Sequence, residues 1–235
     1  MNRKTRLILS LIIILVLIPL TVYLCSLADR KYYLTSSVII ALTLAAFFLK
    51  YEAKAPDARE LVVIAVMCAL AVASRAVFMA VPHFKPTLAV IMITGIAFGP
   101  EAGFLTGAVT ALASNFIFGQ GAWTPWQMFS YGMGGLLAGA FAQLGLLKAA
   151  TQKAKDIIVM SIFGFLTIML IVGPLLDTCS LFIMSSMLTD ATALSVYAAG
   201  VPVNLIHASA TLLTLLLVGK PLLTMLDRIK TKYGI

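Results

Sequence analysis

Long apolar runs, separated by short polar or charged segments, dominate the pattern of this 235-residue chain. Several runs approach the roughly 20 residues that a spanning helix needs, and the alternation typical of an outer-membrane barrel is absent. The pattern predicts an all-α integral membrane protein with eight spans, the fourth too short to cross upright. The expected spans are 7–26, 34–49, 61–81, 87–98, 102–118, 127–147, 157–176 and 196–218.

Composition supports this class of protein. Hydrophobic residues make up 61% of the chain and charged residues 11%, which is too little charge for the surface of a water-soluble domain. The three cysteines are scattered and odd in number, so the sequence offers neither a disulfide framework nor a C-x-x-C metal site. We interpret Cys25, Cys68 and Cys179 as small buried hydrophobic residues.

The distribution of lysine and arginine predicts the orientation. Thirteen of the seventeen basic residues fall in connections on one side of the predicted spans, which by the positive-inside rule places both termini in the cytoplasm. The net charge of +8 therefore reflects membrane topology and not nucleic-acid binding. The first span is interpreted as a retained helix, with a signal peptide as the alternative. The thirteen are Arg3, Lys4, Arg6, Lys50, Lys54, Arg59, Lys148, Lys153, Lys155, Lys220, Arg228, Lys230 and Lys232.

The outward connections have a different chemistry. We expect outward loops at 81–86, 119–126 and 177–194, which contain aromatic, amide, hydroxyl and aspartate side chains. Trp123 and Trp126 taken alone fit an interfacial aromatic belt. Together with the neighbouring Gln120, Gln127 and Tyr131, they combine flat rings with directed hydrogen bonds, which suits a large uncharged or weakly charged organic ligand.

Four further polar residues complete the predicted site. Arg75 either snorkels to the membrane surface or contacts an anion, and Asn115 either joins two helices or contacts ligand. Asp177 and Asn204, near the outer ends of the last two spans, are expected to close the site.

Two other polar residues are interpreted as structural. We read His207, one turn deeper than Asn204, as a hydrogen-bonded structural histidine, and Lys85 as a solvated loop residue.

Several kinds of chemistry have no signature here. The sequence contains no G-x-x-x-x-G-K-[ST] loop for ATP, no H-E-x-x-H zinc motif and no G-x-S-x-G elbow, and no carboxylate lies at the middle of a span. The protein is therefore not expected to be an enzyme or to hold a metal or other cofactor. A self-sufficient secondary transporter, an intramembrane enzyme and a ligand-free scaffold remain the alternatives to a ligand-capturing subunit.

Small residues recur at helical spacing in three spans. Ala65, Ala69 and Ala73 form a ridge on the third span, where another helix can approach closely. Similar ridges, interpreted as internal helix contacts, are Gly103 with Gly107 and Ala111, and Gly135 with Gly139.

The run "FGPEAGFLTGAVTALASNF", the polar aromatic outward loop, the small-residue third span and the basic C-terminal segment resemble the S component, or substrate-capture subunit, of bacterial energy-coupling-factor (ECF) vitamin importers. The resemblance covers about residues 60–219 and implies a six-helix substrate-binding core. It leaves residues 1–59 as two additional N-terminal helices with their connection, and 220–235 as a basic cytoplasmic tail.

The resemblance also implies partners and a ligand. An S component in the bacterial plasma membrane pairs with a transmembrane T component and two cytoplasmic ATPases, and in this chain Ala65, Ala69 and Ala73 match the family's docking face. The "GQGAWTPWQM" loop looks most like that of cobalamin-type members. Cobalamin is therefore the expected ligand, with pantothenate, folate or a queuosine precursor as alternatives.

Overall fold

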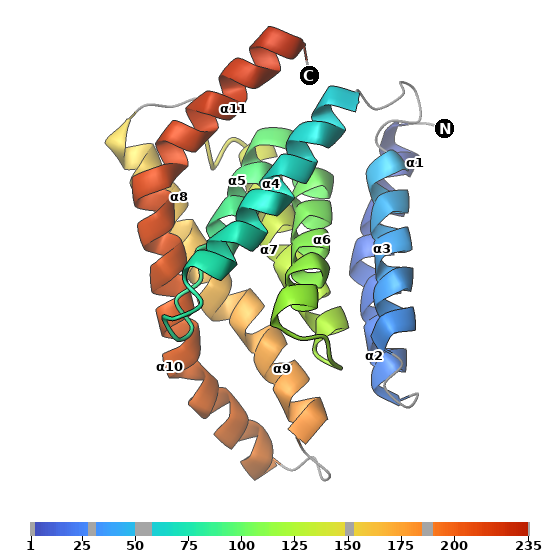
Figure 1. The fold of residues 1–235 in the computed structure, drawn as a ribbon. Helices are drawn as coiled ribbons and strands as arrows, with labels where there is room; N and C mark the ends of the chain where they lie inside the picture. Colours follow the sequence, from blue (N-terminus) through green and yellow to red (C-terminus); the bar gives the residue numbers. More distant parts are fainter. Residues whose placement is uncertain (1–2, 28–31, 50–57, 149–152, 185–189, 235) are drawn as a thin grey trace.

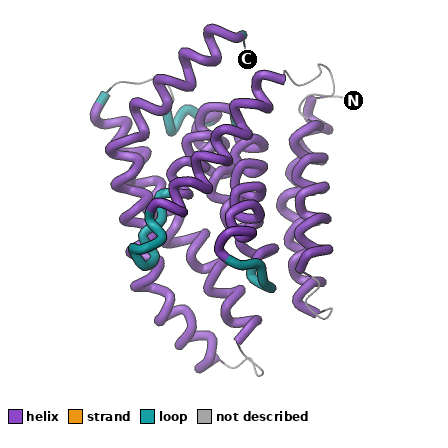
Figure 2. The backbone as a smooth tube through the Cα atoms, in the orientation of Figure 1, coloured by secondary structure: helices purple, strands orange, loops and turns teal. Residues whose placement is uncertain are grey.

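The computed structural model describes residues 3–27, 32–49, 58–148, 153–184 and 190–234, and within these ranges every regular element is a helix (Figures 1 and 2). The helices form eight continuous stretches, which confirms the all-α prediction. They are α1 Arg3–Ile12 with η1 Ile13–Leu17 and α2 Ile18–Leu27; α3 Tyr32–Leu49; α4 Ala58–Val77; α5 Thr87–Phe98; α6 Pro100–Phe118; α7 Thr124–Gln143; α8 Ala154–Thr167 with η2 Ile168–Val172 and α9 Gly173–Met184; and α10 Asp190–Thr214 with η3 Leu215–Gly219 and α11 Lys220–Tyr233.

Four of these helices are long and apolar enough to cross a membrane by length and composition: Ala58–Val77, Pro100–Phe118, Ala154–Leu181 and Ala191–Tyr233. The last two are longer than the sequence pattern predicted. The expected outward loop at 177–194 was wrong for 177–184 and 190–194, which are helical, while 185–189 lie outside the described residues. The C-terminal segment is likewise helical as far as Tyr233.

Three π-helical segments interrupt the described helices, and each ends two residues before a proline. Proline lacks an N–H group, and its ring crowds the carbonyl four residues earlier, which here belongs to the π segment. The wider π turn accommodates both effects and lets the helix continue. The pairs are Ile13–Leu17 with Pro19, Ile168–Val172 with Pro174, and Leu215–Gly219 with Pro221.

The short helix α5 is the centre of the bundle. All twelve of its residues are buried, and it contacts α4, α6, α7, α10 and α11. A helix of twelve residues is about 18 Å long, too short to span the hydrocarbon layer. Because its neighbours enclose it, the side chains of α5 pack against protein and not against lipid.

Glycine allows α5, α6 and α7 to pack with their backbones in contact. A Cβ added to Gly135 would lie 2.2 Å from the carbonyl oxygen of Gly103, and one added to Gly95 would lie 2.2 Å from that of Gly135. A Cβ on Gly107 would lie 2.4 Å from the carbonyl oxygen of Tyr131. The glycine ridges therefore are internal helix contacts, as predicted, and α6 and α7 share the most extensive interface in the described structure.

The helical hairpin of α1, η1, α2 and α3 packs against α6 and α7 on one side of the bundle (Figure 1). The N-terminal end of α1 and the C-terminal end of α11 lie at the same end of the bundle, which we call the Lys230 end (Figure 1). The opposite end contains the connections 78–86 and 119–123, and we call it the Trp123 end. At this end α9 and α10 extend beyond the Gly119–Trp123 loop (Figure 1).

Helix α11 is tied to the core at the Lys230 end. Lys230 Nζ donates a hydrogen bond to the carbonyl oxygen of Ala97 at 2.7 Å and lies 5.5 Å from the ring centroid of Phe98. Arg59 Nη1 of α4 donates to the carbonyl oxygen of Tyr233 at 3.2 Å. The basic C-terminal segment is thus a packed helix.

We predict that Gly135→Ala destabilises the protein by about 1–3 kcal/mol or more, because the new methyl group would overlap the backbone of α6. Thermal unfolding of the detergent-solubilised protein measures the effect. The matched control is Gly134→Ala, whose Cβ would meet only side-chain atoms, the nearest being Leu88 Cδ2 at 3.0 Å. Equal unfolding temperatures for the two variants would contradict the close backbone packing.

Candidate ligand-binding site

Arg75, near the end of α4, turns its side chain toward α6. Its Nη1 donates hydrogen bonds to Ser114 Oγ and to Asn115 Oδ1, the latter at 2.8 Å. The Arg75 Cζ atom also lies 4.7 Å from the ring centroid of Phe118, within the range of a cation–π contact. Of the two interpretations left by the sequence, the geometry disfavours free snorkelling, because polar groups of α6 hold the guanidinium.

Asn115 is the centre of the polar network at this end. Its side chain is fully buried, accepts from Arg75, and donates through Nδ2 to Gln127 Oε1 at 2.7 Å and Thr124 Oγ1 at 3.2 Å. Buried amides are stable only when both their oxygen and their nitrogen have partners, and here both do. Asn115 thereby links α4, α6 and α7.

The network continues along α7. Gln127 Nε2 donates to Tyr131 Oη at 3.2 Å, and both residues are buried. The ring centroid of Tyr131 lies 6.4 Å from that of His207, so the end of the network packs against α10. Gln127 and Tyr131 stand four residues apart, which places both on the same face of α7.

The two tryptophans of the predicted site have different environments. Trp123 ends the loop between α6 and α7, is 46% exposed, and lies against Gly121, where an added Cβ would come 2.4 Å from the indole ring. Trp126 belongs to the first turn of α7 and packs partly buried against the core. Only Trp123 presents much of its ring at the surface.

Gln120 and Thr124 brace this loop. Gln120 Nε2 donates to the carbonyl oxygen of Leu112 at 3.1 Å, and its Oε1 accepts from Thr124 Oγ1 at 2.9 Å. The backbone N–H of Gly121 donates to Thr124 Oγ1 at 3.2 Å. Gly119 has φ of 102°, a left-handed conformation that suits glycine, and it ends α6.

Asp177 and Asn204 contact each other within helices. Asn204 Nδ2 donates to Asp177 Oδ2 at 2.7 Å and joins α9 to α10. Glycines make the approach possible, because a Cβ on Gly200 would lie 2.4 Å from the Asp177 carboxylate and one on Gly173 would lie 2.5 Å from the Asn204 amide. A second bond, between Thr178 Oγ1 and Tyr197 Oη at 2.8 Å, joins the same helices.

Lys85 adds a second cation at the Trp123 end. It lies in the connection between α4 and α5, as predicted, but its side chain is half-buried and not fully solvated. Burial lowers the pKa of the Lys85 ammonium, and the nearby charge of Arg75 lowers it further. A ligand group with negative charge would relieve this repulsion.

The structure therefore joins most of the predicted site residues. Arg75, Asn115, Gln120, Gln127 and Tyr131 belong to one hydrogen-bonded network. The Asp177–Asn204 pair is a separate hydrogen bond between α9 and α10, and His207, three residues after Asn204, places its ring against Tyr131 of the network. Sequence reasoning missed Ser114 and Thr124 as network members, although each stands beside a predicted residue. The described residues contain no cluster of His, Cys, Asp or Glu suited to a metal ion.

The alanine ridge on α4 faces away from the bundle. Ala65, Ala69 and Ala73 are all exposed, whereas Ile64, Met67, Cys68 and Ala71 on the opposite face are buried against the core. Exposed Val62, Val66 and Leu70 flank the ridge. The described N-terminal hairpin packs on α6 and α7 and leaves this face open.

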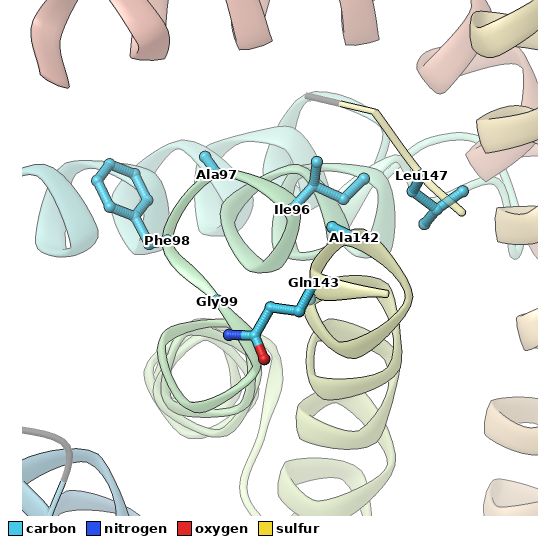
Figure 3. A pocket seen from close by; sticks show the side chains of 8 residues that line it. Ile96, Ala97, Phe98, Gly99, Ala142, Gln143 and Leu147 are labelled. Carbon is cyan, nitrogen blue, oxygen red and sulfur yellow. The ribbon is translucent and has the colours of Figure 1, made fainter. Parts of the chain in front are cut away.

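A separate cavity of about 280 Å³ lies at the Lys230 end, where α5 turns into α6 beside the end of α7 (Figure 3). Most of the side chains that line it are apolar, and Gln143 contributes an amide (Figure 3). None of the residues predicted for the site lines it. The full set is Ile96, Ala97, Phe98, Gly99, Gly139, Ala142, Gln143 and Leu147.

Comparison with known proteins identifies similar sequences. Residues 57–228 match the family described as "ECF-type riboflavin transporter, S component". A UPF0397 protein of Aliivibrio fischeri (strain MJ11) is 27% identical over 116 residues, which cover 46% of this chain and 63% of the relative. A UPF0397 protein of Vibrio atlanticus (strain LGP32) is 32% identical over 93 residues, covering 37% and 50%. The chain thus spans between half and two thirds of these relatives, and no solved structure matches it.

Proposed function

This chain belongs to the S-component family of ECF-type riboflavin transporters, and on that premise we propose that it is the substrate-capture subunit of a vitamin importer. The observation that supports this function most directly is the polar network at the Trp123 end. It links α4, α6 and α7 through side chains that donate and accept hydrogen bonds, and its Tyr131 ring lies against His207 of α10. An exposed tryptophan and two cations lie at the same end.

In this proposal the Trp123 end faces outward and the Lys230 end faces the cytoplasm. The basic residues of α11 and of the connection after α7 lie at the Lys230 end, where the positive-inside rule places them in the cytoplasm. Both termini are then cytoplasmic. A nutrient arriving from outside meets Trp123, Gln120 and Arg75 first.

Cobalamin is the ligand that we propose. Its corrin ring is fringed with amides, and its nucleotide loop carries a phosphodiester anion. The amides of Gln120, Gln127 and Asn115 can exchange hydrogen bonds with the fringe, and Arg75 with Lys85 can pair with the anion. At this end α9 and α10 extend past the Gly119–Trp123 loop (Figure 1), and in this proposal they form one wall of the site.

Riboflavin is the second candidate, because the matched family is described by that vitamin. Its flat ring system suits stacking on Trp123. It is uncharged, however, and so would bring no negative charge to Arg75 and Lys85, which is why we place it second.

The energy for transport comes, in this proposal, from separate subunits. The sequence has no phosphate-binding Walker loop, and the exposed ridge of Ala65, Ala69 and Ala73 provides a smooth surface on which a transmembrane T component can dock. Two cytoplasmic ATPases bound to the T component would supply the ATP hydrolysis.

We predict that the purified full-length protein binds cyanocobalamin in detergent without any nucleotide, because capture precedes the ATP-driven step. Isothermal titration calorimetry against cyanocobalamin, riboflavin, pantothenate and folate measures it. Binding of riboflavin alone would reassign the ligand and keep the capture function. Absence of binding to every vitamin, or uptake driven by an ion gradient through this chain alone, would count against the capture function.

Trp123→Ala is expected to weaken cyanocobalamin binding by about 1–3 kcal/mol, the range for fully burying a large apolar side chain. Since Trp123 is 46% exposed in the structure, its loss should leave the unfolding temperature nearly unchanged. The same titration measures affinity. Phe116→Ala serves as the control, because Phe116 is 71% exposed on α6 and has no role in the proposed site. Wild-type affinity in Trp123→Ala would make this tryptophan an interfacial belt residue.

Ala69→Trp is expected to abolish vitamin uptake by the assembled transporter while leaving vitamin binding intact. The indole would stand on the docking ridge and prevent close approach of another helix, and because Ala69 is exposed it would not disturb the bundle. Uptake in cells and calorimetry on the purified variant separate the two effects. The control is Ala199→Trp, an equally exposed alanine on α10. Normal uptake in Ala69→Trp would exclude docking at this ridge.

A further inference from the structure

His207 has a buried ring nitrogen without a hydrogen-bond partner. The residue is 7% exposed, and no donor or acceptor among the described residues bonds its Nε2 atom. The sequence predicted a hydrogen-bonded structural histidine, and the geometry contradicts that for this nitrogen. A buried polar atom without a partner is costly, because it has given up water and gained nothing in return.

Hydrogen-bonded polar side chains lie on two sides of His207. On one side the Tyr131 ring lies 6.4 Å away, with its hydroxyl bonded to Gln127. One turn of α10 toward the Trp123 end, Asn204 is bonded to Asp177. His207 therefore stands between the two polar groups of the candidate site, and its nitrogen is the unsatisfied atom between them.

Two buried threonines, Thr110 and Thr211, also have hydroxyls that bond to none of the residues that the structure describes. A threonine hydroxyl in a helix can relieve this by bonding the carbonyl four residues earlier, as Thr94 and Thr106 do in this bundle. The imidazole Nε2 lies too far from its own backbone to do the same. Its partner must come from outside the helix.

We propose that His207 is a ligand-contacting residue whose Nε2 forms a hydrogen bond with an amide group of the captured vitamin. An amide offers both a donor and an acceptor and so satisfies either tautomer of the neutral imidazole. This inference rests on the proposed capture function and names a contact deep within the same site. The neighbouring hydrogen bonds of Gln127 with Tyr131 and of Asn204 with Asp177 join side chains to side chains, so in this proposal ligand amides replace them without moving the helices.

The test uses the two histidines of the chain, His83 and His207. His83 lies exposed in the connection between α4 and α5, so His83→Gln leaves a protein with His207 as its single histidine. The full-length variant is labelled with ¹⁵N-histidine and titrated with cyanocobalamin. We expect the Nε2 resonance to shift and to saturate along the same binding curve that calorimetry records.

Substitutions provide an independent readout. His207→Leu is expected to weaken cyanocobalamin binding by about 10- to 100-fold, the loss of one buried hydrogen bond, and to raise the unfolding temperature or leave it unchanged. A purely structural histidine would instead lose stability on substitution. His207→Gln should retain part of the affinity, because its amide can still reach the ligand. Thr211→Val, which removes the other partnerless atom of α10, is the matched control with wild-type affinity expected.

The outcomes separate this inference from the capture function. Calorimetric binding with an unmoved Nε2 resonance, or wild-type affinity in His207→Leu, would overturn the His207 contact and leave vitamin capture standing. If cyanocobalamin fails to bind and riboflavin binds, the labelled protein is titrated with riboflavin. An unmoved Nε2 resonance would then overturn the His207 contact in the same way. If no vitamin binds, the capture function and the His207 contact fail together.

Discussion

The close approach of three backbones at glycine positions is the interaction on which this bundle depends. Gly95, Gly103 and Gly135 bring α5, α6 and α7 so near one another that no side chain fits between them. In lipid, where apolar surface gains little by leaving its surroundings, such contact supplies dispersion energy that longer side chains would prevent. The same close packing explains how the short helix α5 can lie buried at the centre of the bundle. Its neighbours can surround it only because they approach so closely.

The polar network at the Trp123 end depends on that packing. Asn115 of α6 reaches Gln127 of α7 at 2.7 Å because the two helices are held together one to three turns deeper, where Gly107 meets Tyr131 and Gly103 meets Gly135. Arg75 then fastens α4 to the same network. The helix that presents the alanine ridge on its outer face is thus bonded through its inner face to the residues proposed to contact ligand. The proposed capture and docking surfaces therefore share one helix, so a change at either surface acts on the same packed element.

Proline and glycine shape the two longest helices in complementary ways. The π turns before Pro174 and Pro221 let each helix pass a residue that would otherwise break its hydrogen-bond ladder. Gly173 and Gly200, which lie between the two π turns along the chain, leave space for the Asn204 amide and the Asp177 carboxylate. The result is a wall of two long helices whose polar pair lies within the bundle, at the same end as the Arg75 network.

The sequence by itself determined the number and class of the helices, because a backbone in lipid must satisfy its own hydrogen bonds and the length of each apolar run sets each span. It also identified the glycine ridges, the alanine ridge and most residues of the polar network, since small residues and buried amides are conspicuous in an aliphatic chain. It ended the last two spans too early, because "DTCSLFIM" and the basic C-terminal segment look like connections although they are helical. Only the tertiary structure decided which side chains meet: that Arg75 bonds Asn115, that Trp123 is exposed while Trp126 is packed, and that His207 has a nitrogen with no partner in the described part of the chain. Those facts depend on the distance and rotation between helices, which no single segment encodes.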